Sequence, residues 1–337
     1  MSRWPKVAVA SIRIICFALL GATVLWGPPA GAQTPKLKIG TLGVPSTSIW
    51  MVSVLRAKRF DLKNGIDIEW VEQPSTAAVY NDFAAGSYKV ATGGLMGYAN
   101  QYARGVKLKA FATYQIFGSS VIVNTERAPN IDAMKDLNGK EIAAPLASEN
   151  TRAMEIYLKW SGVDLKSLKI KNFEQPGVVA ELRSPTGSAV AGIVFSQVPT
   201  RLVMDESKKF KDLVPADDLD KLWRQRTGTE YHWLLGWVAH DDFARDNKDL
   251  LQKTHNAMKE TIDWFNKNSE EALDIVAKRT KEPIPILRET LKAKRVRFLQ
   301  LTAESQEKAM MELFKQGVGI GMIAKLPDAN FFYRGLR

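Results

Sequence analysis

Strand-like and helix-like segments alternate along the chain from residue 37 onward, and this alternation constrains the fold more than any other feature. The helical patterns end at glycines such as Gly86 and Gly105, which are suited to a position just past a helix. Strands are expected at 37–41, 66–71, 89–92, 108–114, 141–144, 169–173, 189–195 and 231–239, and helices up to 59, at 77–85, 96–104 and 151–161, and from 199. This rhythm predicts an α/β fold with helices layered on a mainly parallel sheet.

One unit of this rhythm occurs twice. A strand, a proline, a loop with Ser and Thr, and a helix follow one another at 37–59 and again at 141–161. We interpret the repeat as two similar lobes: residues 33–118 with 230–337 form lobe I, and residues 119–229 form lobe II. The chain would then cross between the lobes near 115–123 and 225–232, and two crossings make a hinge.

The first residues have the pattern of a secretory signal peptide. Arg3 and Lys6 precede a mostly apolar stretch at 7–26, and small residues at 30–32 suit a signal peptidase. We predict a signal peptide at 1–32, cleavage before Gln33, and a periplasmic product. The alternative is an uncleaved membrane anchor, which the internal Arg13 and the short apolar length disfavour.

Charge and cysteine content narrow the possible partners. The chain has 47 basic and 36 acidic residues, a formal net charge of +11, and cleavage would leave about +8. Its one cysteine, Cys16, would be lost with the signal peptide, so no disulfide is expected. The basic residues are scattered and accompany no nucleic-acid-binding motif, so we expect no nucleic acid partner and better capture of anionic solutes.

The common catalytic motifs are missing from the sequence. The three histidines, His232, His240 and His255, have no zinc-binding spacing, and no nucleophile elbow, phosphate-binding loop or dinucleotide fingerprint occurs. We therefore expect no metal, no cofactor and no enzymatic activity.

Two loops that precede helices are candidates for ligand binding. The loops at 45–48 and 147–152 place hydroxyl side chains beside the free N–H groups of a helix start. Such a helix start attracts anions, although Ser, Thr and Asn are also ordinary helix caps there. If the two starts face one cleft, they and Arg152 could clamp a carboxylate or a sulfonate.

Several segments resemble one known family. The clearest are Asp136-Leu137-Asn138-Gly139-Lys140-Glu141-Ile142-Ala143-Ala144-Pro145 followed by Ser148, Phe60-Asp61-Leu62-Lys63-Asn64-Gly65-Ile66-Asp67-Ile68, Ala84-Ala85-Gly86, Pro199, and His240-Asp241-Asp242-Phe243-Ala244. In order and spacing they are similar to the periplasmic solute-binding proteins that feed importers of nitrate, sulfonate, taurine and thiamine precursors. Lys89 and Val190 stand where the family usually has Asp, and Ala147 replaces a frequent Gly, so ligand identity does not transfer.

The resemblance implies a two-lobed periplasmic-binding-protein (type II) fold with two chain crossings at the hinge. It implies capture of a small organic anion (a sulfonate, a carboxylate or an aromatic acid) by hinge closure, and delivery to an ABC permease in the inner membrane. We expect the protein to act as a monomer. Two alternatives remain: a thiamine-precursor synthase-like enzyme on the same fold, and a sensory module that presents its ligand to a membrane receptor.

Carried over loop by loop, the resemblance also predicts the ligand-binding residues. They are Ser46, Thr47, Ser48, Trp50, Thr92, Gly93, Gly94, Tyr114, Gln115, Ser148, Asn150, Thr151, Arg152, Ser196, Gln197 and His232. Trp50, Phe117, Tyr231 and Trp233 could add an aromatic wall. The alternative for Trp50 and Trp233 is a place in the core.

Overall fold

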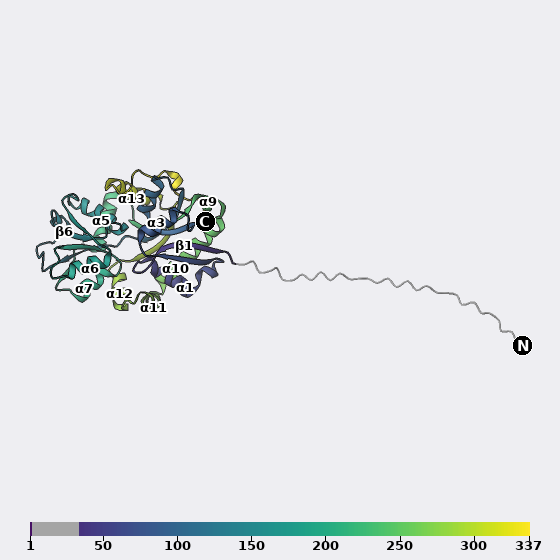
Figure 1. Ribbon diagram of the computed structural model, residues 1–337, viewed down its shortest axis with the longest axis horizontal. Helices are drawn as coiled ribbons and strands as arrows, with labels where there is room; N and C mark the ends of the chain where they lie inside the picture. The colour runs from purple at the N-terminus through teal and green to yellow at the C-terminus, as the bar shows by residue number, and fades with distance from the viewer. Residues whose placement is uncertain (2–33) are drawn as a thin grey trace. The chain divides into compact units, whose positions relative to one another are not determined.

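Two β-sheets organise the chain in the computed structural model, which describes Met1 and residues 34–337. The first sheet has the strand order β11-β4-β10-β3-β1-β2 and the second β7-β6-β8-β5-β9. We call the six-stranded sheet with its helices the first lobe, and the five-stranded sheet with its helices the second lobe (Figure 1). The predicted two-lobed α/β fold is confirmed, whereas the exact lobe boundaries stay a prediction.

The strands of the first lobe come from both ends of the described chain. They are β1 (Lys36–Leu42), β2 (Asp67–Gln73), β3 (Val90–Gly94), β4 (Leu108–Ile116), β10 (Trp233–His240) and β11 (Arg297–Thr302). The strands of the second lobe are contiguous in sequence: β5 (Ser120–Asn124), β6 (Glu141–Ala144), β7 (Lys169–Asn172), β8 (Ala191–Val194) and β9 (Phe210–Asp212).

Helices flank both sheets. They are α1 (Ser48–Lys58), α2 (Phe60–Lys63), α3 (Thr76–Ala84), α4 (Leu95–Ala103), α5 (Glu149–Trp160), α6 (Gln175–Arg183), α7 (Val198–Asp205), α8 (Ala216–Thr227), α9 (Asp241–Asp246), α10 (Lys248–Lys267), α11 (Ser269–Thr280), α12 (Ile284–Lys292) and α13 (Glu307–Gly319), with 3₁₀ turns η1 (Met134–Leu137) and η2 (Ala329–Phe331). Proline opens α6, α7 and α12 within the first turn, where a missing N–H breaks no helical bond. Every helix of the described chain is too short or too polar to cross a bilayer.

All eight strands expected from the sequence are confirmed, but the expectation of mainly parallel sheets is wrong. The strands β1, β2 and β3 pair in parallel, as do β6, β7 and β8, whereas β5, β10 and β11 are antiparallel to their neighbours. The reason is topological. The strands β5 and β10 each follow a passage from the other lobe, so they begin at the edge of the sheet where the parallel strands end.

Two connections join the sheets, as predicted. The chain leaves the first sheet after β4 and enters the second at β5, and it returns through α8 to β10. The helix α12 adds a further contact between the lobes, because it packs on α11 of the first lobe and on α7 of the second. The helix α13 likewise contacts both α4 and α5.

An aromatic cluster lies where the two connections meet, and we call it the hinge stack. It consists of Phe117, Tyr157, Trp223 and His232. The His232 ring is stacked between Phe117 and Trp223, at centroid distances of 4.7 and 4.1 Å. The Tyr157 hydroxyl is hydrogen-bonded to His232 Nδ1 at 2.7 Å. The hinge stack is fully buried and belongs to the main hydrophobic core. The predicted signal peptide, apart from Met1, lies outside the described residues and stays a prediction.

Candidate functional site

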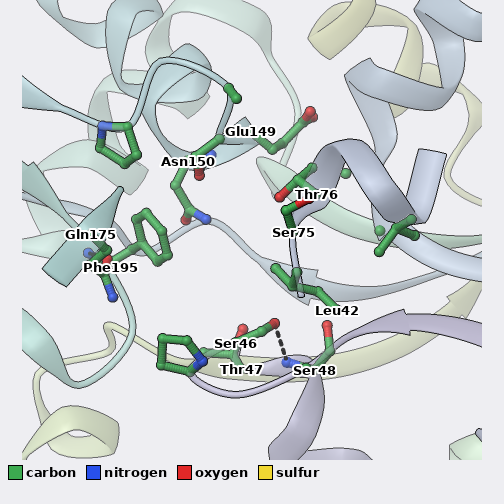
Figure 2. Close-up of a pocket in the computed structure, with 18 of the residues that line it drawn as sticks. Leu42, Ser46, Thr47, Ser48, Ser75, Thr76, Glu149, Asn150, Gln175 and Phe195 are labelled. Atoms are coloured by element: carbon green, nitrogen blue, oxygen red, sulfur yellow. Dashed lines mark hydrogen bonds between the residues drawn. The ribbon is translucent and has the colours of Figure 1, made fainter. Parts of the chain in front are cut away.

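Five helix starts, three from the first lobe and two from the second, surround one cavity between the lobes. The helices are α1, α3 and α4 on one side and α5 and α6 on the other. Figure 2 labels residues at the starts of α1, α3, α5 and α6. The cavity has a volume of about 240 Å³. The first N–H groups of a helix have no partner inside the helix, and the helix dipole adds partial positive charge there. The cavity is therefore surrounded by backbone groups that favour an anion.

The start of α1 is held in place from behind by β4. Thr47 Oγ1 donates to Gln115 Oε1 at 2.7 Å, and the hydroxyls of Ser48 and Tyr114 are 2.9 Å apart. The Ser48 N–H donates to Ser46 Oγ at 3.1 Å, the bond drawn in Figure 2. Thr47 and Ser48 line the cavity, whereas Tyr114 and Gln115 form the layer behind it.

The second lobe contributes the starts of α5 and α6. Ser148 caps α5 by accepting from the Asn150 N–H at 3.2 Å, and Asn150 Oδ1 accepts from Ser119 Oγ at 2.7 Å. Gln175, in the first turn of α6, accepts from the Phe195 N–H through Oε1 at 3.1 Å. Its Nε2 is buried and has no hydrogen-bond partner within the described chain. An unpaired buried donor costs about 1–3 kcal/mol, so this amide lacks a hydrogen-bond partner that a ligand could supply.

The ionisable groups of the wall are acidic or phenolic. Among the described residues that line the cavity there is no Lys, Arg, His or Cys, and the carboxyl groups are those of Glu149 and Glu174. Burial raises the pKa of Glu149 to about 8, against the opposing effect of the Met96 and Gly97 amides and of Arg152. Burial also raises the pKa of Tyr80 well above its ordinary value. The positive charge that the wall offers to a ligand therefore comes from the helix starts.

The structure brings half of the predicted ligand-binding residues together on the cavity wall. They are Ser46, Thr47, Ser48, Thr92, Gly93, Gly94, Ser148 and Asn150. Each lies at the end of a strand, at the start of a helix or in the loop between the two. Their role in binding a ligand stays a prediction.

The other predicted residues do not line the cavity. Tyr114 and Gln115 lie behind it, and Thr151 is buried inside the first turn of α5. Arg152 faces away, because its guanidinium pairs with Glu155 at 2.7 Å and donates to the Ile320 carbonyl at 3.3 Å. The predicted clamp on an anion by Arg152 is therefore wrong.

Two further predicted residues, Ser196 and Gln197, lie beyond the wall residue Phe195. Gln197 Nε2 donates to Glu282 Oε1 at 3.3 Å, and so it joins the second lobe to the start of α12. His232 is in the hinge stack, where burial lowers its pKa to about 3. His232 is thus part of the core and not of the wall.

The expected aromatic wall of Trp50, Phe117, Tyr231 and Trp233 is also not found. Trp50 packs against Phe265 and Phe298 in the first-lobe core, Phe117 is in the hinge stack, and none of the four lines the cavity. The core alternative was correct for both tryptophans, since each is fully buried. The aromatic side chains that do line the cavity are Tyr80 and Phe195.

Sequence reasoning missed several wall residues, and one signal would have found most of them. Ser75 and Thr76 follow β2 and Pro74, and Glu174 and Gln175 follow β7, so both pairs repeat the strand–loop–helix unit recognised elsewhere. Glu149 lies within a loop that was singled out, but as an acid it did not suggest an anion site. Leu42, Val44 and Leu235 gave no signal in the sequence.

This arrangement, two α/β lobes with a cavity between facing helix starts, is the fold of solute-binding proteins. The chain belongs to the NMT1/THI5-like family, which matches residues 56–272. A comparison with curated protein sequences gives no significant match.

Solved structures support the same fold at low sequence identity. The alkanesulfonate-binding protein SsuA of Xanthomonas axonopodis pv. citri, bound to MOPS, matches with a TM-score of 0.70 at 15% identity, over 87% of this chain and 96% of that one. The aliphatic sulphonate-binding protein SsuA of Escherichia coli matches with a TM-score of 0.72 at 16% identity, over 90% and 93%. The nitrate-binding protein NrtA of Synechocystis PCC 6803 matches with a TM-score of 0.65 at 15% identity, over 87% and 83%.

Proposed function

We propose that this protein is an exported solute-binding protein of an ABC importer. It captures a small organic anion between its two lobes in the periplasm and delivers it, as a monomer, to a permease in the inner membrane. The family, the fold and the predicted signal peptide support this role. The observation that carries it is the convergence of five helix starts from both lobes on one cavity, of which those of α1, α3, α5 and α6 are not occupied by a carboxyl group of the described chain.

The wall supports a ligand with a single negative charge. Backbone N–H groups and hydroxyls are available at the helix starts, and no basic side chain of the described wall would balance a second charge. The volume of about 240 Å³ is below the range of about 300–1,000 Å³ for drug-sized ligands. A small sulfonate or carboxylate suits both features.

Native mass spectrometry of freshly purified protein tests for a co-purified solute, and calorimetric titration then measures affinity for sulfonates, carboxylates and pyrimidines. We expect binding tighter than about 1 mM for at least one monoanion. No binding across this panel at that level would contradict the proposal.

A matched pair of glutamines locates the site. Gln175 lies on the wall with a free Nε2, whereas Gln197 is equally buried but pairs with Glu282 outside the cavity. Gln175→Met should weaken solute binding by about tenfold, because one buried hydrogen bond is lost. Gln197→Met removes only the bond to Glu282 outside the cavity, so it should weaken solute binding less than Gln175→Met does. Equal effects of the two substitutions would count against this cavity as the binding site.

A further inference from the structure

One carboxyl group connects the two lobes beside the cavity. Glu149 is the first residue of α5 in the second lobe, and its side chain reaches the start of α4 in the first lobe. Glu149 Oε1 accepts from the Met96 N–H at 2.7 Å, and Oε2 accepts from the Gly97 N–H at 3.2 Å. The N-terminus of α4, which would otherwise attract a solute anion, is therefore occupied by a group of the protein itself.

The start of α4 is shaped to receive this side chain. Glu149 is only 4% exposed. A Cβ atom on Gly94 would lie 2.5 Å from Glu149 Oε2, so only glycine leaves room for the carboxyl group. The Tyr80 hydroxyl donates to the Gly94 carbonyl at 3.1 Å and fixes the same turn. The contact is thus a fitted one between the lobes.

We propose that Glu149 is a latch between the lobes: closure seats its carboxyl group on the Met96 and Gly97 amides, and opening returns this carboxyl group to water. This inference rests on the proposed function, because it assumes that the lobes open and close around a solute. It adds a named residue that positions α4 and α5 over the cavity, and a dependence of closure on pH.

The direction of the pH dependence follows from burial. In the closed protein the pKa of Glu149 is raised to about 8, whereas a carboxyl group returned to water has the ordinary value of 4.5. Between these two values the closed state binds more protons than the open state. The closing equilibrium constant should therefore fall as the pH rises through this range, by up to about tenfold per pH unit.

The other charged or titratable groups near Glu149 do not produce this response. Tyr80 on α3 and Tyr98 on α4 have pKa values raised well above 10 by burial, so they stay neutral. The guanidinium of Arg152 on α5 is paired with Glu155. Glu155 on α5 also has a pKa raised by burial, but it pairs with Arg152 within the second lobe. Glu155 therefore serves as the matched control.

The test measures the distance between the lobes without any solute. Cysteines that replace the exposed Ala84 on α3 and Ala180 on α6, with Cys16→Ser, carry a donor and an acceptor dye. The protein is unfolded and refolded first, which removes co-purified solute. Energy transfer is then recorded from pH 5 to pH 8.5 for the labelled protein with Glu149 unchanged, which we call the Glu149 form. The same measurement is made on this protein with Glu149→Gln, Glu149→Ala or Glu155→Gln.

We expect the closing equilibrium constant of the Glu149 form to fall by at least about a hundredfold from pH 5 to pH 8. Glu149→Gln, which does not titrate and offers one acceptor oxygen in place of two, should show no pH dependence and close less than the Glu149 form does at pH 5. Glu149→Ala should be more open than Glu149→Gln at every pH. Glu155→Gln should respond as the Glu149 form does. A pH-independent distance in the Glu149 form, or a response that persists in Glu149→Gln, would overturn the latch. Because no solute is present, failure of the proposed function would appear only in the solute titrations.

Discussion

The cavity wall and the hinge stack both contain residues that the sequence marks as candidate ligand contacts, but they differ in construction. Most wall residues lie at strand ends, at helix starts or in the loops between them, and they include Gln175, whose buried Nε2 has no partner in the described chain. In the hinge stack the Phe117, Trp223 and His232 rings lie face to face without a cavity between them. The position of a polar residue in the strand–loop–helix unit therefore predicts whether it lines the cavity or packs in the core. The chemical type of the residue predicts this less well.

This comparison makes its largest prediction at Trp223. Trp223→Ala should lower the free energy of unfolding by about 3–5 kcal/mol, because it leaves a cavity between Tyr157 and His232 in a fully buried cluster. Denaturant unfolding followed by circular dichroism measures the change. Trp223→Phe should recover much of the loss. A loss below about 1 kcal/mol for the alanine variant would mean that the hinge stack is not a core.

The next prediction concerns pH and His232. Burial holds the pKa of His232 at about 3, so this ring stays neutral in the folded protein while the unfolded chain takes up a proton near pH 6.5. The unfolded state then binds more protons between these values, and stability falls as the pH drops below 6.5. By pH 5 the loss from this residue should be about 2 kcal/mol.

Chemical unfolding at pH 7 and pH 5 checks this value by comparison with His232→Phe, which keeps a stacked ring but does not titrate. His255, whose pKa burial lowers to about 4, contributes in the same direction to both proteins and cancels in the difference. An identical loss in the two proteins would show that His232 is accessible to protons, as a ligand-binding histidine on the wall would be.

Much of this organisation could be predicted because it depends on local signals. Hydrophobic runs indicated the strands, and Ser148 was correctly expected at a helix start, where its hydroxyl accepts from Asn150. The failures needed tertiary information. The rotation of α5 against α13 decides whether the Arg152 side chain points to the cavity or pairs with Glu155. Trp50 is a core residue because it packs on α10 and β11, which are far away in sequence. The antiparallel pairing of β10 likewise depends on how the chain returns from the second lobe.

The smallest expected effect lies at the boundary of the two regions, at Gln115, which was predicted as a ligand contact but supports the wall from behind. Its Oε1 accepts from Thr47 Oγ1 at 2.7 Å. Gln115→Met keeps the length of the side chain but removes this acceptor, so the Thr47 hydroxyl loses its fixed orientation. We expect affinity for the identified solute to fall by about two- to tenfold, the value of one hydrogen bond.

A double-mutant cycle with Thr47→Val separates support from direct contact. If Gln115 acts only through Thr47, adding Gln115→Met to Thr47→Val should change solute affinity no further, because residues that share one interaction are not additive. Calorimetric titration of the two single variants and the double variant gives the coupling. Full additivity would instead mean that Gln115 touches the solute itself, and the layer behind the wall would then belong to the binding surface.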